Sequence, residues 1–220
     1  ALSEIVEQAA EIGAERFVLD DGWFGTRDDD TQSLGDWDID PRKYPNGLAP
    51  LIAKVNEQGM SFGIWFEPEM INPNSDLYRR HSEWVLGPLD QLQGRGQLVL
   101  DMANADVRDY LFSKISAILS DHNVSYIKWD HNRVLPHVDA AQTHGTYNLL
   151  ARLRDAHPDV EIESCSSGGG RIDFGIMRYT QRVWLSDSND AAERLRMQHE
   201  ASHFLPLAVT GSHVGPRECH

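Results

Sequence analysis

The chain has 220 residues and a formal net charge of -14, from 20 Lys and Arg against 34 Asp and Glu. This acidic balance argues against nucleic acid and an anionic membrane surface as partners, because both need a basic face. A chain of this length can bury one substantial core, and β/α barrels commonly take about 250 residues as one domain. A hydrophobic fraction of 40% and a charged fraction of 25% exclude a disordered or fibrous chain.

The sequence contains two cysteines, Cys165 and Cys219, which are too few for a disulfide framework. We therefore expect a reducing, cytoplasmic location. No apolar run approaches the roughly 18 residues of a membrane span, and no signal peptide is visible.

Apolar runs of strand length alternate with helical patterns along the whole chain. The strands are predicted at residues 16–22, 61–68, 97–102, 126–130, 160–165, 182–187 and 207–213. The helices are predicted at residues 3–13, 48–58, 105–119, 144–156 and 191–204. Because the strand runs are continuously apolar, they predict a parallel sheet covered by helices. One more strand ahead of residue 1 would bring the number to eight, so we expect an incomplete α/β barrel, a (β/α)8 TIM barrel without its first strand and last helix.

A doubly wound open sheet is the structural alternative. It predicts a glycine-rich phosphate loop after an early strand. The glycine run at 168–170 comes late in the chain and follows Cys165 and two serines, so it does not fit that loop. The sequence therefore favours the barrel.

Acidic side chains follow several of the predicted strands, at the edge where β/α barrels carry their chemistry. A purely structural sheet rarely gathers like charges, because they repel one another and lose solvation. The acids at this edge are Asp20, Asp21, Glu67, Glu69, Asp101, Asp130, Asp187 and Asp190. Glycoside cleavage needs two carboxyl groups, one to attack the anomeric carbon and one to protonate the leaving oxygen and then activate water. No cofactor or metal is required. Residue pattern alone leaves open which acid has which role.

Eight segments in chain order resemble the family-36 α-galactosidases. They are 19–24 (LDDGWF), 34–37 (LGDW), 43–48 (KYPNGL), 65–70 (WFEPEM), 98–101 (LVLD), 126–133 (YIKWDHNR), 163–173 (ESCSSGGGRID) and 183–190 (VWLSDSND). The resemblance covers nearly the whole chain. It implies a retaining glycosidase that releases terminal α-galactosyl residues from raffinose-type and melibiose-type α-galactosides. It also implies that residues 1–220 are the catalytic barrel alone, without the flanking β-rich domains of a family whose full-length members are expected to be homo-oligomers.

The same resemblance implies roles for individual residues. Asp130, in the Lys-Trp-Asp motif, corresponds to the nucleophile, and Asp187, in the Trp-Leu-Ser-Asp motif, corresponds to the general acid/base. The positions that match the galactose site are Asp20, Asp21, Trp65, Arg95, Lys128, Cys165 and Gly168. The implied partner is thus a small carbohydrate.

The chemistry of the motif around Asp130 fits this assignment. Lys128 precedes Asp130 by two residues, so both side chains point to one face of a strand. A nearby ammonium keeps a nucleophilic carboxylate ionised. For a retaining enzyme, we expect the carboxyl groups of Asp130 and Asp187 to lie about 5–5.5 Å apart.

Other readings of the strand-end residues remain. Asp190 competes with Asp187, although Asp-Ala-Ala-Glu at 190–193 is a capping box that favours a helix cap. Glu67 and Glu69 are a rival catalytic pair, although a role in ligand binding or loop support is favoured. Cys165 is a possible nucleophile, but no His is arranged to activate it, so a buried or sugar-lining thiol is favoured. Trp23 and Trp65 are expected to contact the sugar, and core packing is the alternative.

Residues 199–203 match the His-Glu-x-x-His pattern of zinc peptidases, with His199 and His203 as ligands and Glu200 as base. The predicted helix that carries them faces outward from a barrel, and no third ligand is evident. This zinc peptidase is the main alternative from another class. Galactosyl transfer through the same covalent intermediate and galactose binding without turnover are two further alternatives.

Overall fold

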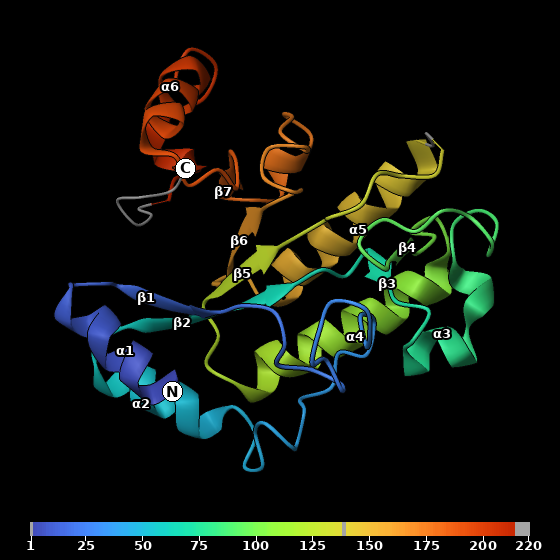
Figure 1. Cartoon of the computed structure of the whole chain (residues 1–220), viewed down its shortest axis with the longest axis horizontal. Coiled ribbons are helices and arrows are strands. Elements are labelled where there is room, and N and C mark those ends of the chain that lie inside the picture. Colours follow the sequence, from blue (N-terminus) through green and yellow to red (C-terminus); the bar gives the residue numbers. More distant parts are fainter. Residues whose placement is uncertain (1, 138–139, 214–220) are drawn as a thin grey trace.

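The computed structural model describes residues 2–137 and 140–213. Its main sheet has six parallel strands in the order β1-β2-β5-β6-β7-β8, and Figure 1 shows this sheet curling like the wall of a barrel. The strands are β1 (Arg16–Leu19), β2 (Ser61–Phe66), β5 (Tyr126–Trp129), β6 (Glu161–Ser164), β7 (Arg182–Trp184) and β8 (Thr210–Gly211). The strand order never reverses, whereas a doubly wound sheet reverses at its switch point. The prediction of an incomplete α/β barrel is confirmed.

The five predicted helices are present, each within a few residues of its expected bounds. They are α1 (Leu2–Glu11), α2 (Ala49–Glu57), α4 (Ala105–Asp121), α5 (Ala140–Ala156) and α6 (Ala191–Ala201). A short helix, α3 (Asp76–Arg80), and three single turns, η1 (Ser82–Trp84), η2 (Ile176–Arg178) and η3 (Leu207–Val209), lie in the connections. Within the described residues, no helix combines the length and apolarity that a membrane span requires.

The strand predicted at residues 97–102 does not join the main sheet. Its centre, β4 (Leu98–Val99), pairs in antiparallel fashion with β3 (Met70–Ile71) in a separate two-stranded sheet. The prediction that this run is a barrel strand is wrong, because continuous apolar residues report burial and not the identity of the pairing partner. Leu98, Val99 and Leu100 are all 0% exposed. Closing an eight-stranded barrel therefore takes two strands beyond the six described here, rather than one.

Aromatic side chains fill the space beneath the ends of β1 and β2. The cluster consists of Trp23, Phe24, Trp37, Trp65 and Phe66, with ring centroids 4.4–6.3 Å apart. The indole N–H of Trp23 donates to the carbonyl oxygen of Trp65 at 2.9 Å. Because Trp23 is 0% exposed, the expectation that it contacts a sugar is wrong. It is a core residue that supports Trp65.

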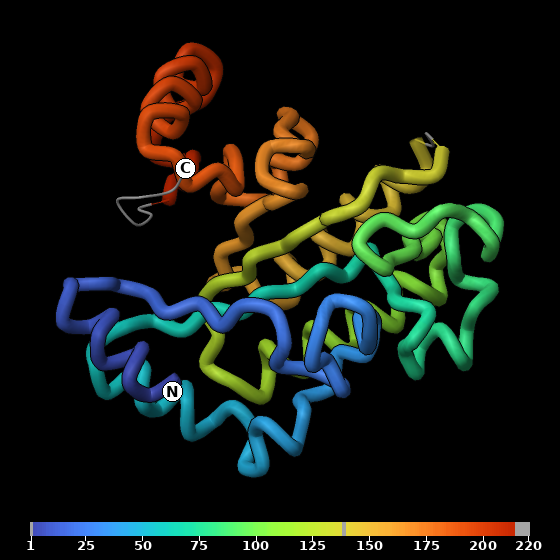
Figure 2. The backbone as a smooth tube through the Cα atoms, in the orientation of Figure 1, coloured from blue at the N-terminus to red at the C-terminus, as the bar shows by residue number. Residues whose placement is uncertain are grey.

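The segment that follows β7 is packed less closely than the rest of the chain. After β7, the backbone passes out to α6 and returns to β8 (Figure 2). Figure 1 shows α6 projecting away from the other helices. Arg194 is its single buried residue, and the guanidinium donates to the carbonyl oxygens of Ser186 and Gly211. Arg194 therefore ties α6 to the backbone after β7 and at β8.

Candidate functional site

Apart from Arg95, the residues predicted to form the site lie at one edge of the main sheet. Lys128 of β5 is in register with Trp65 of β2 and with Glu163 of β6. The other predicted positions follow the ends of their strands, namely Asp20 and Asp21 after β1, Asp130 after β5, Cys165 after β6 and Asp187 after β7. Parallel strands bring their carboxyl ends to the same edge, so residues far apart in sequence meet here.

Asp130 is buried, with 7% of its surface exposed. Its Oδ1 accepts the backbone N–H of His131 at 2.8 Å. Its Oδ2 accepts the indole N–H of Trp65 at 3.2 Å and the side-chain amide of Asn132 at 2.6 Å. The backbone N–H of Asp130 donates to the Phe66 carbonyl oxygen at 2.8 Å, which extends the strand pairing by one residue. Both carboxylate oxygens are thus held in fixed directions.

Asn132 is a site residue for which the sequence predicts no specific role. It comes two residues after Asp130, a spacing that an extended chain places on one face. That spacing is the available signal, but β5 ends at Trp129, so the contact depends on the conformation of the loop after the strand. Ser167 also bonds Asn132, at 3.1 Å, so Asn132 links the loops after β5 and β6.

Lys128 extends its ammonium toward the acids of this edge. Its Nζ lies 3.9 Å from Oδ2 of Asp20 and 5.4 Å from the centre of the Trp184 ring. Burial opposes the charge of Lys128, but the negative charges around it, including those of Asp20 and Asp130, outweigh burial and raise its pKa. Lys128 is therefore a cation at neutral pH, as the sequence predicts.

Asp20 and Asp21 are held differently, although they are neighbours. Asp21 is bound by the buried guanidinium of Arg27, whose Nε and Nη2 lie 2.9 and 2.7 Å from its two oxygens. Arg27 is anchored in turn by Asn72 at 3.0 Å. Asp20 is exposed and approaches Lys128 instead. The structure thus places Asp20 beside Lys128 and ties Asp21 to Arg27 in the loop after β1.

Cys165 is a free cysteine that is 2% exposed. Burial, together with the charge of Asp130, raises the pKa of its thiol far above the ordinary value. A thiol with a raised pKa stays protonated and is a poor nucleophile. The buried thiol predicted from the sequence is therefore favoured over a nucleophilic cysteine.

Gly168 brings the loop after β6 against the segment that carries Asp187. It has φ +84, and a Cβ on Gly168 would lie 2.7 Å from Cα of Ser186 and 3.1 Å from the backbone nitrogen of Asp187. No side chain fits at that separation, so glycine is needed for this contact. Gly168 thereby holds the backbone at Asp187 in place.

Asp187 itself is exposed and accepts the indole N–H of Trp184 at 2.9 Å. Its separation from Asp130 stays a prediction. Asp190 is the N-cap of α6, where its side chain accepts the backbone N–H of Glu193 at 2.9 Å. The prediction of a cap at Asp190 is confirmed.

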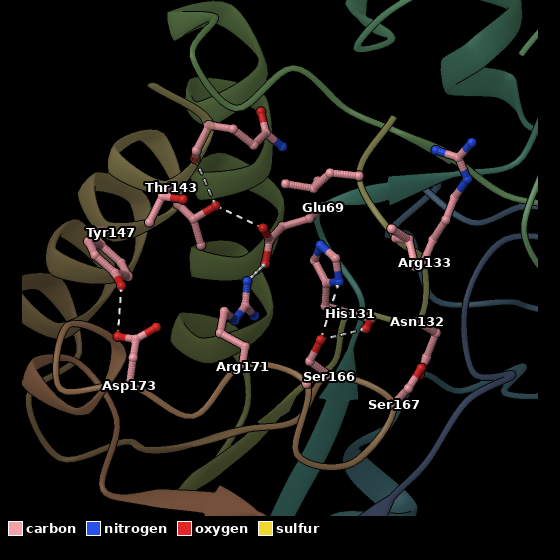
Figure 3. A pocket seen from close by; sticks show the side chains of 15 residues that line it. Glu69, His131, Asn132, Arg133, Thr143, Tyr147, Ser166, Ser167, Arg171 and Asp173 are labelled. Atoms are coloured by element: carbon pink, nitrogen blue, oxygen red, sulfur yellow. Dashed lines mark hydrogen bonds and ion pairs between the residues drawn. The ribbon is translucent and has the colours of Figure 1, made fainter. Parts of the chain in front are cut away.

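Glu67 and Glu69 are buried on either side of Pro68, at 1% and 2% exposure. Burial, helped by the charge of Asp130, raises the pKa of Glu67 to about 8. Burial acts on Glu69 as well, but Arg171, 2.7 Å away, together with His131 and the indole N–H of Trp129, outweighs burial and lowers the pKa of Glu69 to about 2 (Figure 3). Both carboxyl groups are closed off from solvent, which favours the support role predicted for them over catalysis.

Arg95 lies in the loop before β4, where the backbone turns back between Gly94 and Gln97. It is exposed and has φ 54, an uncommon conformation for a residue with a side chain. Its charge opposes the rise in the Glu67 pKa. Arg95 is therefore close enough to influence Glu67, from the outer rim of the site.

Two cavities adjoin this edge. One of about 720 Å³ opens on the concave face of the sheet and is lined by Asp20, Lys128, Glu163 and Trp184, among others. The other, of about 530 Å³, lies between the loops after β5 and β6 and the start of α5 (Figure 3). Asn132 and Ser167 line this second cavity.

The zinc-peptidase pattern lies on the surface of α6. Glu200 forms an ion pair with Arg196 at 2.9 Å, and the rings of His199 and His203 lie 5.1 Å apart. Across residues 2–137 and 140–213, no three His, Cys, Asp or Glu side chains gather where they could hold a metal ion. The pattern therefore lacks a third ligand in this part of the chain.

The amino-acid sequence is similar to several curated proteins named α-galactosidase. An "Alpha-galactosidase" of Escherichia coli is 48% identical over 228 residues, which cover 100% of this chain and 32% of the relative. "Alpha-galactosidase AgaA" of Geobacillus stearothermophilus is 44% identical over 96% of this chain and 31% of its own length. The chain thus spans about a third of the length of the curated relatives it matches.

Solved structures agree with this relationship. The galactosidase domain of AgaSK, an α-galactosidase–sucrose kinase, superposes with a TM-score of 0.94 at 42% identity over 100% of this chain and 31% of that one. A variant of the family-36 enzyme AgaA in complex with raffinose superposes with a TM-score of 0.90 at 42% identity, over 97% of this chain and 32% of that one. The resemblance to family 36 is therefore confirmed. Because the Melibiase family profile also matches residues 1–220, this chain belongs to the melibiase family.

Proposed function

We propose that residues 1–220 are the catalytic barrel domain of a retaining α-galactosidase. Its substrates are terminal α-galactosides of the raffinose and melibiose type, and its intermediate is a galactosyl ester of Asp130. The observation that carries the proposal is the geometry of Asp130, a buried carboxylate fixed by three donors beside an ammonium. The relatives named α-galactosidase add support, as do the complexes of AgaA variants with raffinose and stachyose.

The first chemical step transfers the galactosyl group to the enzyme. A carboxylate oxygen of Asp130 forms a bond to the anomeric carbon while the glycosidic bond breaks, and Asp187 gives its proton to the departing oxygen. The donors from Trp65 and Asn132 hold Oδ2 of Asp130 in place. The carboxylate is therefore oriented before the attack and has little rotational freedom left to lose in the transition state.

The second step returns the enzyme to its starting state. Asp187, now ionised, takes a proton from water, and the water oxygen bonds to the anomeric carbon as the ester bond to Asp130 breaks. Asp187 is exposed, so water can reach it. Two displacements at one carbon give net retention of configuration.

The residues around Asp130 are proposed to bind the galactosyl hydroxyl groups. Asp20 and Lys128 supply an acceptor and a donor beside the concave cavity. Trp65 and Cys165, which contact Asp130, and Gly168, which lies against the backbone at Asp187, are proposed to form the wall of the site. Asp21 and Arg95 complete the proposed set at the border of the site.

Trapping the intermediate tests the proposal directly. The protein at its full natural length is treated with a fluorinated α-galactoside whose ester turns over slowly, digested, and mapped by mass spectrometry. The galactosyl group is expected on the peptide that contains Asp130. An ester on any other residue, or inversion of configuration in the released sugar, would overturn the assignment. Comparing free galactose with transfer products on the same samples measures how water and sugar acceptors compete.

We also infer the setting of the whole protein. The resemblance to family 36 leads us to expect flanking β-rich domains and a homo-oligomer. The acidic charge and the two cysteines lead us to expect a cytoplasmic protein that binds neither nucleic acid nor membranes. Cell fractionation and sedimentation of the protein at its full natural length test these expectations. Recovery in the membrane fraction, or as a monomer, would contradict them.

A further inference from the structure

Glu67 is a buried carboxyl group close to Asp130, the proposed nucleophile. It follows the last residue of β2 and is 1% exposed. Its Oε1 accepts the backbone N–H of Asn132 at 2.5 Å, and the side-chain amide of Asn132 donates to Oδ2 of Asp130 at 2.6 Å. Two hydrogen bonds thus connect Glu67 to Asp130 through one residue.

The second oxygen of Glu67 meets a buried amide instead of a cation. The Nε2 of Gln97 lies 3.0 Å from Oε2 of Glu67, and the other amide atom, Oε1, is a buried acceptor without a donor. A side-chain amide carries a donor on one atom and an acceptor on the other, and these exchange places when the amide turns over. With the amide turned over, Oε1 of Gln97 would accept a proton carried by Glu67.

The charges around Glu67 favour that proton. Among the described residues, no Lys, Arg or His forms an ion pair with Glu67. Asp130, at the end of β5, adds a negative charge, and the charge of Arg95, in the loop before β4, opposes it only in part. Glu69, two residues further on, has the ion pair with Arg171 that Glu67 lacks. An unpaired carboxyl in a closed site beside another carboxylate is stable in its neutral form.

We propose that Glu67 is a neutral carboxylic acid that acts as a positioning residue for Asp130. It holds the backbone of Asn132, so that the Asn132 amide fixes Oδ2 of Asp130, and it adds no second negative charge to the site. The catalytic part of this inference rests on the proposed role of Asp130, whereas the protonation of Glu67 does not.

Infrared spectroscopy measures the protonation without any turnover. Difference spectra of the protein at its full natural length are recorded between pH 6 and pH 10, for the parent and for Glu67→Gln. The parent is expected to lose a protonated-carboxyl band with a midpoint near the raised pKa of about 8, and Glu67→Gln is expected to lack this band. Asp130→Asn should lower the midpoint, because it removes the neighbouring charge. Identical spectra for the parent and Glu67→Gln would overturn the proposal.

Glu83→Gln is the matched control for these spectra. Glu83 is exposed, and its hydrogen bond with His81 lowers its pKa, so it is ionised over the whole pH range. This substitution is expected to leave the difference spectrum unchanged. A band lost in Glu83→Gln as well would contradict the assignment to Glu67.

Kinetics tests the positioning role. Glutamine has the shape and neutrality of the protonated acid, whereas alanine leaves the Asn132 N–H without its acceptor. On an aryl α-galactoside at pH 6.5, Glu67→Ala is expected to lower kcat by about 100-fold through the loss of alignment. Glu67→Gln is expected to keep kcat close to that of the parent. Equal losses in the two variants would show that a charged carboxylate is needed and would overturn the proposal. If the infrared band is present but neither Asp130→Asn nor Glu67→Ala lowers kcat, the proposed function fails and the protonation of Glu67 stands.

Discussion

Asp130 and Asp187 lie at the same edge of one sheet, yet the chain around them is packed to different degrees. Asp130 is 7% exposed and accepts a hydrogen bond from Trp65, which belongs to the buried aromatic cluster that also contains Trp23. Asp187 is exposed and is held by one indole N–H, from Trp184, and by the close approach of Gly168. The proposed nucleophile is thus oriented by a core, and the proposed acid/base by a few surface contacts.

The helices show the same difference. The helix α4 buries Val107, Leu111, Ile115, Ile118 and Leu119. In contrast, α6 buries Arg194 alone and leaves Leu195 76% exposed. Alignment that is set by close packing resists small disturbances, because cores are dense and relax little. We therefore expect substitutions near Asp130 to act through stability and alignment, and those near Asp187 to act on proton transfer.

The largest expected effect comes from Asp130→Asn in the protein at its full natural length. Removing the nucleophile removes the covalent route, so kcat should fall by at least about 10,000-fold for every α-galactoside. The measurement is steady-state hydrolysis of raffinose and of an aryl α-galactoside. A residual rate within about 100-fold of the parent would assign the nucleophile to another group.

Asp187→Asn should lower the rate of hydrolysis by a factor that depends on the leaving group of the substrate. General acid catalysis contributes about 100- to 10,000-fold, so turnover of raffinose is expected to fall by about 1,000-fold. An aryl α-galactoside with an acidic phenol needs little protonation and should lose much less in the first step. Equal losses of kcat/KM, which reports the first step, for the two substrates would contradict the role of Asp187 as an acid.

The sequence predicts which edge of the sheet carries the site residues, but not how the side chains there are oriented and paired. Continuous apolar runs that end in acids predicted where Asp20, Asp130 and Asp187 gather. The role of Trp23 was predicted wrongly, because Gly22, at φ +99, breaks the side-chain alternation that β1 would otherwise continue. The position of Gln97 against Glu67 depends on how a long loop folds back, and no local pattern encodes that.

The aromatic cluster offers a test that does not involve activity. Trp23→Ala removes a side chain that is 0% exposed, and such truncations cost about 3–5 kcal/mol. Leu195→Ala, on the exposed face of α6, should change the free energy of unfolding by less than about 0.5 kcal/mol. Urea unfolding followed by tryptophan fluorescence measures both. Comparable losses in the two variants would mean that α6 is as closely packed as the rest of the molecule.

Glu67 and Glu69 give the most specific contrast, because their contributions to stability should depend on pH in opposite ways. The folded protein keeps the Glu67 proton up to about pH 8, while the unfolded chain releases it near the ordinary pKa of 4.5. The stability that this proton contributes is fully present below pH 4.5 and is lost as the pH rises to about 8. Relative to Glu67→Gln, the parent should therefore lose about 1.4 kcal/mol per pH unit across this window.

The sign reverses for Glu69, whose pKa is lowered from 4.5 to about 2. Its contribution is present above pH 4.5 and is lost as the pH falls toward 2. The advantage of the parent over Glu69→Gln should thus be constant near neutral pH and shrink in acid. Unfolding curves at several pH values measure both differences. A difference for Glu67→Gln that does not change between pH 5 and pH 8 would mean that this carboxyl is ionised in the folded protein. In that case, two unscreened negative charges would face each other across Asn132, and the packing around Asp130 would have to stabilise both.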